Sequence, residues 1–121
     1  MKKIVIVDDS ETIATIIKRV LERQGYAVHA TLDSTAVFSE QVLDFGPDLF
    51  ILDINMPKAD GFSILENIRR MPRLRQVKVV MCSTKFFEHD IERARELGAD
   101  SFLVKPFSES ELIDTVVSVL A

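Results

Sequence analysis

Cysteine is scarce in this sequence: Cys82 is the only one among 121 residues. A lone cysteine cannot form a disulfide within the chain, which indicates a reducing compartment. Long apolar runs are also lacking, since no stretch approaches the roughly 20 residues that a membrane-spanning helix requires. The apolar segment after Lys2 and Lys3 is too short for a signal peptide and ends at Asp8. We therefore expect a soluble, cytoplasmic protein.

Positive charge is not in excess either, because the formal net charge is −4 at pH 7. Such a chain has no electrostatic footprint for nucleic acid or for an anionic membrane. A glycine-rich phosphate loop of the GxxxxGK[ST] type is missing, which argues against nucleotide binding. The hydrophobic fraction of 47% is ordinary for a globular protein. We predict a single domain over residues 1–121.

Short apolar runs alternate with amphipathic segments along the chain. Strands are expected at residues 4–7, 26–30, 49–52, 77–82 and 101–104. Helices are expected after Ser10, after Asp33 or Ser34, from about Phe62, from about Asp90 to Leu97, and after Ser108. In the last helix the residues expected to face inward are Leu112, Ile113, Val116, Val117 and Leu120. This alternation predicts an α/β protein with a parallel sheet covered by helices on both faces.

Polar side chains follow four of the predicted strands. In open parallel sheets, ligands bind outside the carboxyl ends of the strands. The residues at those ends are Asp8, Asp9, Asp53, Ser83, Thr84, Lys105 and Pro106. Carboxylates so close repel by roughly 2–4 kcal/mol per pair at an effective dielectric near 20, and a hard cation such as Mg²⁺ relieves this.

An aspartate beside Mg²⁺ can act as a nucleophile toward phosphorus. A lysine and a hydroxyl can bind the oxygens of the transferred group. The strand ends therefore hold the parts of a phosphoryl-transfer site.

The chain resembles a response-regulator receiver domain, and most of all the stand-alone, CheY-like kind. The resemblance covers essentially the whole chain. It rests on the acidic pair Asp8-Asp9, the segment D-I-N-M-P-K-A-D-G from Asp53 to Gly61, Ser83, and Lys105-Pro106. It implies a flavodoxin-like, doubly wound five-stranded sheet with strand order 2-1-3-4-5.

The resemblance also implies roles for these residues in a two-component system. Asp53 would accept a phosphoryl group from a sensor histidine kinase or phosphotransfer protein, and Lys105 would contact that group. Mg²⁺ would be bound by Asp9, Asp53 and the backbone carbonyl of Asn55, with Asp8 acting mainly through water. The Lys105-Pro106 bond would be cis. The domain would assist its own phosphorylation and dephosphorylation as a signalling switch, and we do not expect it to be an enzyme.

Switching is implied to pass through Ser83, which would swing toward the phosphoryl oxygen while Phe102 turns inward. The face formed by the fourth helix, fifth strand and fifth helix would then change its affinity for a partner protein. Phe86 and Phe87 cannot easily both point inward, so one is expected in the core and the other as a partner contact beside Phe102. Monomer and phosphorylation-dependent dimer both stay open.

Some positions depart from the commonest family pattern. Thr84 stands where a small residue is usual, and Phe102 replaces a frequent tyrosine. Lys85 occupies a place where side chains often tune attack by water. We expect Asn55, Thr84 and Lys85 to tune access to the phosphoryl group, and Thr84 to lengthen its life.

The sequence also allows other functions and other roles for these residues. A phosphatase of the haloacid dehalogenase type would need an acid two residues after Asp53, where the chain has Asn55. A flavin carrier on the same fold would need a phosphate-binding loop in place of Asp8-Asp9. Asp8-Asp9 as a helix-start pair, Ser83 and Thr84 as plain strand-end hydroxyls and Lys105 as a turn lysine are the structural alternatives. The chain is expected to carry no effector segment after Leu120, or else to be the receiver part of a longer regulator.

Overall fold

The computed structural model of the protein describes residues 1–56, 60–84 and 87–121. The strands are β1 Lys3–Val7, β2 Ala27–Thr31, β3 Leu49–Asp53, β4 Lys78–Ser83 and β5 Ser101–Val104. The helices are α1 Glu11–Arg23, α2 Glu40–Phe45, α3 Gly61–Arg70, α4 Glu88–Glu96 and α5 Glu109–Leu120, with a short 3₁₀ helix η1 at Ser34–Phe38. All strand pairs are parallel and the order is β2-β1-β3-β4-β5, which confirms the predicted topology.

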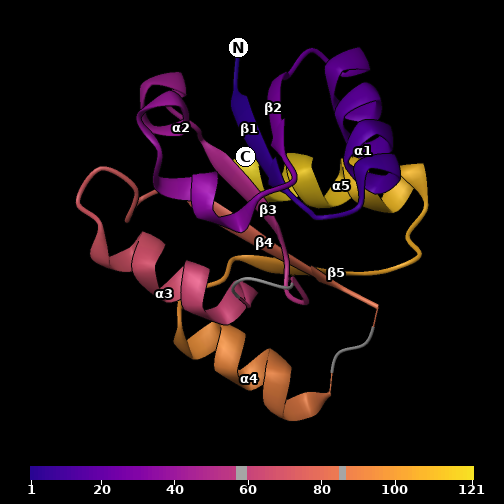
Figure 1. Cartoon of the computed structure of the whole chain (residues 1–121). Coiled ribbons are helices and arrows are strands. Elements are labelled where there is room, and N and C mark those ends of the chain that lie inside the picture. Colours follow the sequence, from indigo (N-terminus) through magenta and orange to yellow (C-terminus); the bar gives the residue numbers. More distant parts are fainter. Residues whose placement is uncertain (57–59, 85–86) are drawn as a thin grey trace.

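The sheet lies between two layers of helices (Figure 1). Helices α1 and α5 cover one face, while α2, α3 and α4 cover the other. The central strand β3 alternates between these layers: Phe50 and Leu52 join the core beside α3, and Leu49 and Ile51 join the core beside α1. Burial of each such side chain stabilises the fold by about 1.5–3 kcal/mol, which explains why β3 is a continuous apolar run.

Side-chain caps fix where α1 and α5 begin. The Ser10 hydroxyl accepts a hydrogen bond from the Ile13 N–H at 3.3 Å, as an N-cap does. Ser108 and Glu111 form a reciprocal pair, with N···O distances of 3.1 and 3.0 Å. Both predicted caps are thus confirmed. Helices α1 and α5 therefore begin shortly after β1 and β5, at the carboxyl edge of the parallel sheet.

The second helix is shorter than the sequence predicts. Ser39 has extended backbone and separates η1 from α2, and its hydroxyl accepts a hydrogen bond from the Val42 N–H at 3.3 Å. Serine competes for local backbone hydrogen bonds, so it caps a new helix here instead of continuing the old one. Helix α4 begins at Glu88, earlier than the predicted Asp90, because the Asp90 carboxylate accepts the Phe87 N–H at 3.1 Å.

The prediction that Val117 faces inward is wrong. Val117 is 52% exposed, whereas Leu112 and Val116 on the same helix are buried. The apolar set on α5 spans a wider arc than the stripe that contacts the sheet, so its outer member reaches solvent. Ile16 on α1 is 56% exposed for the same reason.

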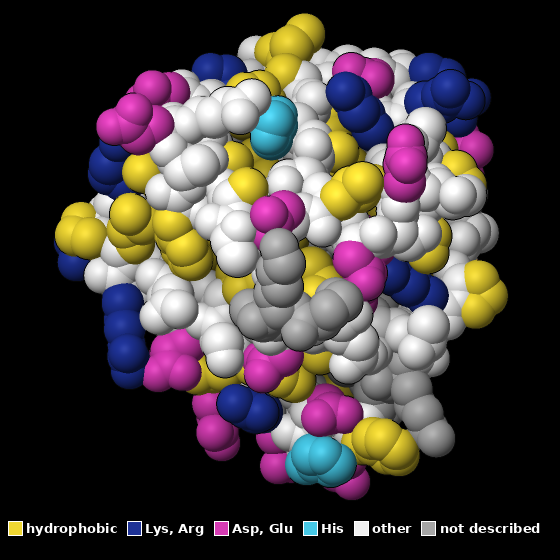
Figure 2. Space-filling model, in the orientation of Figure 1, with side chains coloured by type: hydrophobic (Ala, Val, Ile, Leu, Met, Phe, Trp, Pro, Cys, Tyr) yellow, Lys and Arg dark blue, Asp and Glu magenta, His cyan; other side chains and the backbone are white. Residues whose placement is uncertain are grey.

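Surface charge is mixed on the face shown in Figure 2, where basic and acidic side chains alternate among the described residues. This distribution matches the small net charge of −4. Within residues 1–56, 60–84 and 87–121, none of the helices has the length and apolar character needed to cross a bilayer.

Candidate functional site

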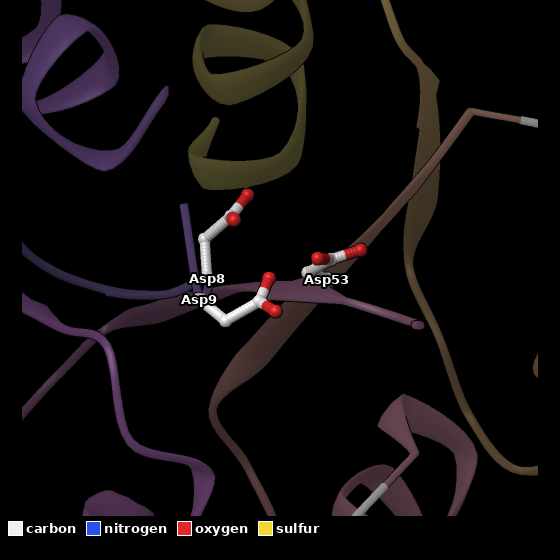
Figure 3. Close-up of side chains that lie close together, drawn as sticks. All are labelled: Asp8, Asp9 and Asp53. Atoms are coloured by element: carbon white, nitrogen blue, oxygen red, sulfur yellow. The ribbon is translucent and has the colours of Figure 1, made fainter. Parts of the chain in front are cut away.

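Three carboxylates meet at the carboxyl edge of the sheet (Figure 3). Asp8 and Asp9 follow β1, and Asp53 is the last residue of β3. Each offers one carboxylate oxygen, and these three oxygens lie within 4.8 Å of one another. Asp8 and Asp53 are only 2% and 7% exposed, while Asp9 is exposed to solvent. The site is therefore a buried acidic pair with one open side.

Lys105 reaches this cluster from the end of β5. Its Nζ donates a hydrogen bond to Asp8 Oδ2 at 2.7 Å and lies 3.6 Å from Asp53 Oδ2. Burial by itself lowers the pKa of Lys105, but the hydrogen bond and charge of Asp8 and the charge of Asp53 outweigh it, so the pKa is raised. The lysine stays protonated. Its peptide bond to Pro106 is cis, in agreement with the implied geometry.

The environment of Asp53 disfavours its negative charge. Burial is the main reason that the pKa of Asp53 is raised, and the charges of Asp8 and Asp9 add to the effect. The positive charge of Lys105 and the Asn55 N–H, which donates to Asp53 Oδ1 at 3.3 Å, act in the opposite direction. A further cation beside Asp53 would therefore stabilise the charged form of this carboxylate.

The donor set fits Mg²⁺. The cluster presents carboxylate oxygens, which hard cations prefer, and the exposed Asp9 leaves one side open to water. The only cationic side chain paired with it among the described residues is Lys105, which compensates one negative charge of three. Asp8, Asp9 and Asp53 could therefore hold a divalent ion together.

Gly61 allows the loop after Asp53 to close tightly against the sheet. A Cβ atom added at Gly61 would lie 2.9 Å from the Asp53 carbonyl oxygen and 2.9 Å from the Ile54 Cα. The Gly61 N–H donates to the Ile54 carbonyl at 2.9 Å, so α3 begins directly beside the acidic cluster. Any side chain here would push α3 away from Asp53.

Ser83 lies on the neighbouring strand end and is 1% exposed. The side-chain amide of Asn55 donates a hydrogen bond to the Ser83 hydroxyl oxygen at 3.3 Å. Phe102, on β5, is half-buried and packs against the core on the α3 side of the sheet. The predicted switch residues Ser83 and Phe102 therefore lie on the neighbouring strands β4 and β5.

Thr84 is exposed and lines an open groove of about 400 Å³ at the edge of the site. The other lining residues are Ile13, Ile16, Ile17, Lys105, Pro106 and Phe107. This groove was not predicted from the sequence, because it is built from α1, Thr84 and the β5–α5 connection. Its one sequence signal is an isoleucine at the outer margin of the apolar stripe of α1, Ile16.

Of the two aromatic residues after Lys85, the structure describes Phe87. Phe87 is 50% exposed and stacks on His89 with ring centroids 5.7 Å apart. Lys85 and Phe86, which were predicted to tune access and to bind a partner, lie outside the described residues.

Comparison with known proteins agrees with this geometry. Residues 4–117 match the family model of the response regulator receiver domain. The chain is 35% identical over 119 residues to the alkaline phosphatase synthesis transcriptional regulatory protein PhoP of Bacillus subtilis, covering 98% of this chain and 48% of PhoP. It is 31% identical over 118 residues to the chemotaxis protein CheY of the same organism, covering 98% of this chain and 97% of CheY. The chain spans about half the length of relatives such as PhoP.

Among solved structures, the chemotaxis response regulator CheY4 of Vibrio cholerae superposes with a TM-score of 0.91 at 28% identity, over 99% of both chains. The shared sheet order, the acidic edge and the family match over residues 4–117 lead to one conclusion. The chain belongs to the response regulator receiver domain family of two-component signalling.

Proposed function

We propose that Asp53 is the phosphoacceptor of this receiver domain. The observation that carries this proposal is the position of Asp53, with carboxylate oxygens of Asp8 and Asp9 within 4.8 Å and Lys105 Nζ at 3.6 Å. An Asp53 oxygen attacks the phosphorus of a phosphohistidine on a sensor kinase or phosphotransfer protein. The O–P bond forms, the N–P bond breaks, and the imidazole leaves with the electron pair and takes up a proton.

Asp8, Asp9 and Asp53 would hold Mg²⁺ in this proposal, with the carbonyl of Asn55 as a further oxygen ligand. When bound, the ion supplies positive charge next to the phosphoryl oxygens. Lys105 is already protonated beside Asp53, so it can pair with a phosphoryl oxygen after a small displacement from Asp8. Ser83 donates its hydroxyl proton to another oxygen, and Phe102 turns further inward.

We place the output surface on α4, β5 and α5. Three large apolar side chains on or next to these elements are about half exposed: Phe87, the N-cap of α4, at 50%, Val104 of β5 at 53% and Val117 of α5 at 52%. Exposed apolar groups on the elements that flank or contain Phe102 suit a surface whose affinity for a partner protein changes with the state of Asp53.

A single measurement tests the phosphoacceptor. The protein is incubated with acetyl phosphate and Mg²⁺ and its intact mass is determined. We expect a phosphate-sized mass increase in the wild type and in the control Asp44→Asn, whose side chain is 77% exposed, and none in Asp53→Asn. An adduct that persists in Asp53→Asn contradicts the proposal.

A phosphatase of the haloacid dehalogenase type has less support. That reaction needs an acid two residues after the nucleophile, and Asn55 instead uses its amide to bind Ser83. We propose a signalling switch that turns over only its own phosphoryl group. Multiple turnovers of p-nitrophenyl phosphate would overturn this assignment.

A further inference from the structure

Asn55 joins two parts of the site that are far apart in sequence. It follows β3, while Ser83 ends β4, 28 residues later. Its backbone N–H donates to Asp53 Oδ1 at 3.3 Å, and its side-chain amide donates to Ser83 Oγ at 3.3 Å. One residue thus contacts both the proposed phosphoacceptor and the proposed switch hydroxyl.

The two partners of this hydrogen bond differ in burial. Ser83 is 1% exposed although it stands at the strand end, whereas Asn55 is exposed. The amide therefore bonds the hydroxyl of a buried residue from a residue that itself reaches solvent. A buried hydroxyl that loses a hydrogen-bond partner is penalised, so the bond resists movement of Ser83.

We propose that Asn55 is a latch on Ser83: it holds the hydroxyl in its resting position and must release it when Asp53 is phosphorylated. This rests on the proposed function and adds its regulation. The release has a physical cause, because phosphorylation turns the Asp53 carboxylate into an acyl phosphate, whose negative charge lies on the phosphoryl group and not on the carbonyl oxygen. A neutral acyl oxygen accepts the Asn55 N–H more weakly than a carboxylate oxygen does. The hydrogen bond from Asn55 to Asp53 therefore weakens, and Asn55 becomes freer to move away from Ser83.

A double-mutant cycle with the phosphoryl analogue beryllofluoride tests the latch. Affinity in the presence of Mg²⁺ is measured by calorimetry for the wild type, Asn55→Ala, Ser83→Ala and the double variant. We expect Asn55→Ala to bind the analogue roughly two- to tenfold more tightly than the wild type, which corresponds to one hydrogen bond. In the Ser83→Ala background the same change should have no effect.

Three outcomes decide the matter. An equal effect of Asn55→Ala in both backgrounds, or weaker binding by Asn55→Ala, overturns the latch, because Asn55 would then act by another route. Asn67→Ala, an exposed asparagine on α3, is the matched control and should bind like the wild type. A wild type that binds no better than Asp53→Asn overturns the proposed function itself, and the latch with it.

A second measurement needs no phosphoryl group. In NMR spectra of the unmodified protein, the side-chain NH₂ protons of Asn55 should exchange with water more slowly than those of Asn67. Ser83→Ala should remove this protection. Equal exchange for the two asparagines in the wild type overturns the latch even if beryllofluoride binds at Asp53.

Discussion

Lys105 is closer to Asp8 than to Asp53: its Nζ lies 2.7 Å from Asp8 Oδ2 and 3.6 Å from Asp53 Oδ2. The lysine therefore neutralises Asp8 more fully. Asp53 keeps a buried negative charge with weaker compensation, and its pKa is raised by burial and by the neighbouring acids. Because of this imbalance, a further positive charge near Asp53 would stabilise its carboxylate.

Removing the charge of Asp53 should stabilise the protein when no divalent ion is present. Because the folded-state pKa lies above the ordinary 3.8, the charged form is disfavoured, and stability is lost as pH rises through the folded-state pKa. In EDTA at pH 7, Asp53→Asn should melt a few degrees higher than the wild type, and this gain should shrink as pH falls toward 3.8. Asp44→Asn, a change at an exposed acid, should show neither effect.

Mg²⁺ should stabilise the wild type through the acidic cluster. An ion that binds only the folded state contributes about 2.7 kcal/mol at a hundred times its Kd. We expect the melting temperature of the wild type to rise with millimolar Mg²⁺ and that of Asp9→Ala to change little. An equal rise in both proteins would show that the ion binds elsewhere.

Thr84→Ala should shorten the life of the phosphoryl group. Thr84 and Lys105 line the same groove, and we expect the β-branched side chain of Thr84 to narrow the approach of water to Asp53. We expect Thr84→Ala to lose its phosphoryl group severalfold faster than the wild type. The loss is measured by intact mass at intervals after acetyl phosphate is removed. Thr35→Ala, far from this groove on η1, serves as the control; no acceleration in Thr84→Ala contradicts the proposed shielding.

Arg69 holds together the end of the molecule opposite the acidic cluster. Its guanidinium donates to the Gly98 carbonyl from Nε at 3.1 Å and from Nη2 at 2.6 Å. It also binds the Arg75 and Val77 carbonyls and the Asp100 carboxylate. Gly98 has φ +95°, and a Cβ there would lie 2.8 Å from Arg69 Nε. The ends of α3 and α4 are thus joined to β4 through one side chain.

Arg69→Leu should therefore lower the free energy of unfolding by about 2–4 kcal/mol, because several carbonyls lose their donor. Urea denaturation measures the change. The neighbouring Arg70→Leu is a matched control, since Arg70 is 73% exposed and pairs only with Glu66 among the described residues. It should cost less than about 1 kcal/mol. Similar losses in both variants would argue against the role of Arg69.

Cys82 should make the fold sensitive to strongly alkaline pH. Burial raises the pKa of its thiol from 9.0 to about 12, so above pH 9 the unfolded chain loses a proton that the folded chain keeps. Stability should then fall with rising pH, by at most about 1.4 kcal/mol per pH unit from this group. The free energy of unfolding is measured by urea denaturation from pH 8 to about 11 for the wild type and for Cys82→Ala. The difference between the two proteins isolates the contribution of the thiol. A parallel decline in both proteins would contradict it.

Much of the fold follows from local patterns in the sequence. The short apolar runs at β1 and β3 predict strands buried on both faces, and Ser10 and Ser108 carry the side-chain oxygen that starts a helix. Ser39 was missed because its apolar neighbours Val37 and Val42 fit one continuous helical stripe, and the cap it forms depends on how the backbone turns there.

The sequence by itself determined the strands, the polar residues that follow four of them and the family resemblance, because these depend on residue type and spacing along the chain. Only the tertiary structure decided that Lys105 pairs with Asp8, that Asn55 donates a hydrogen bond to Ser83, and that α1 contributes a wall of the groove beside Thr84. These contacts join residues up to 97 positions apart. Their distances depend on how strands and helices pack, which no local pattern encodes.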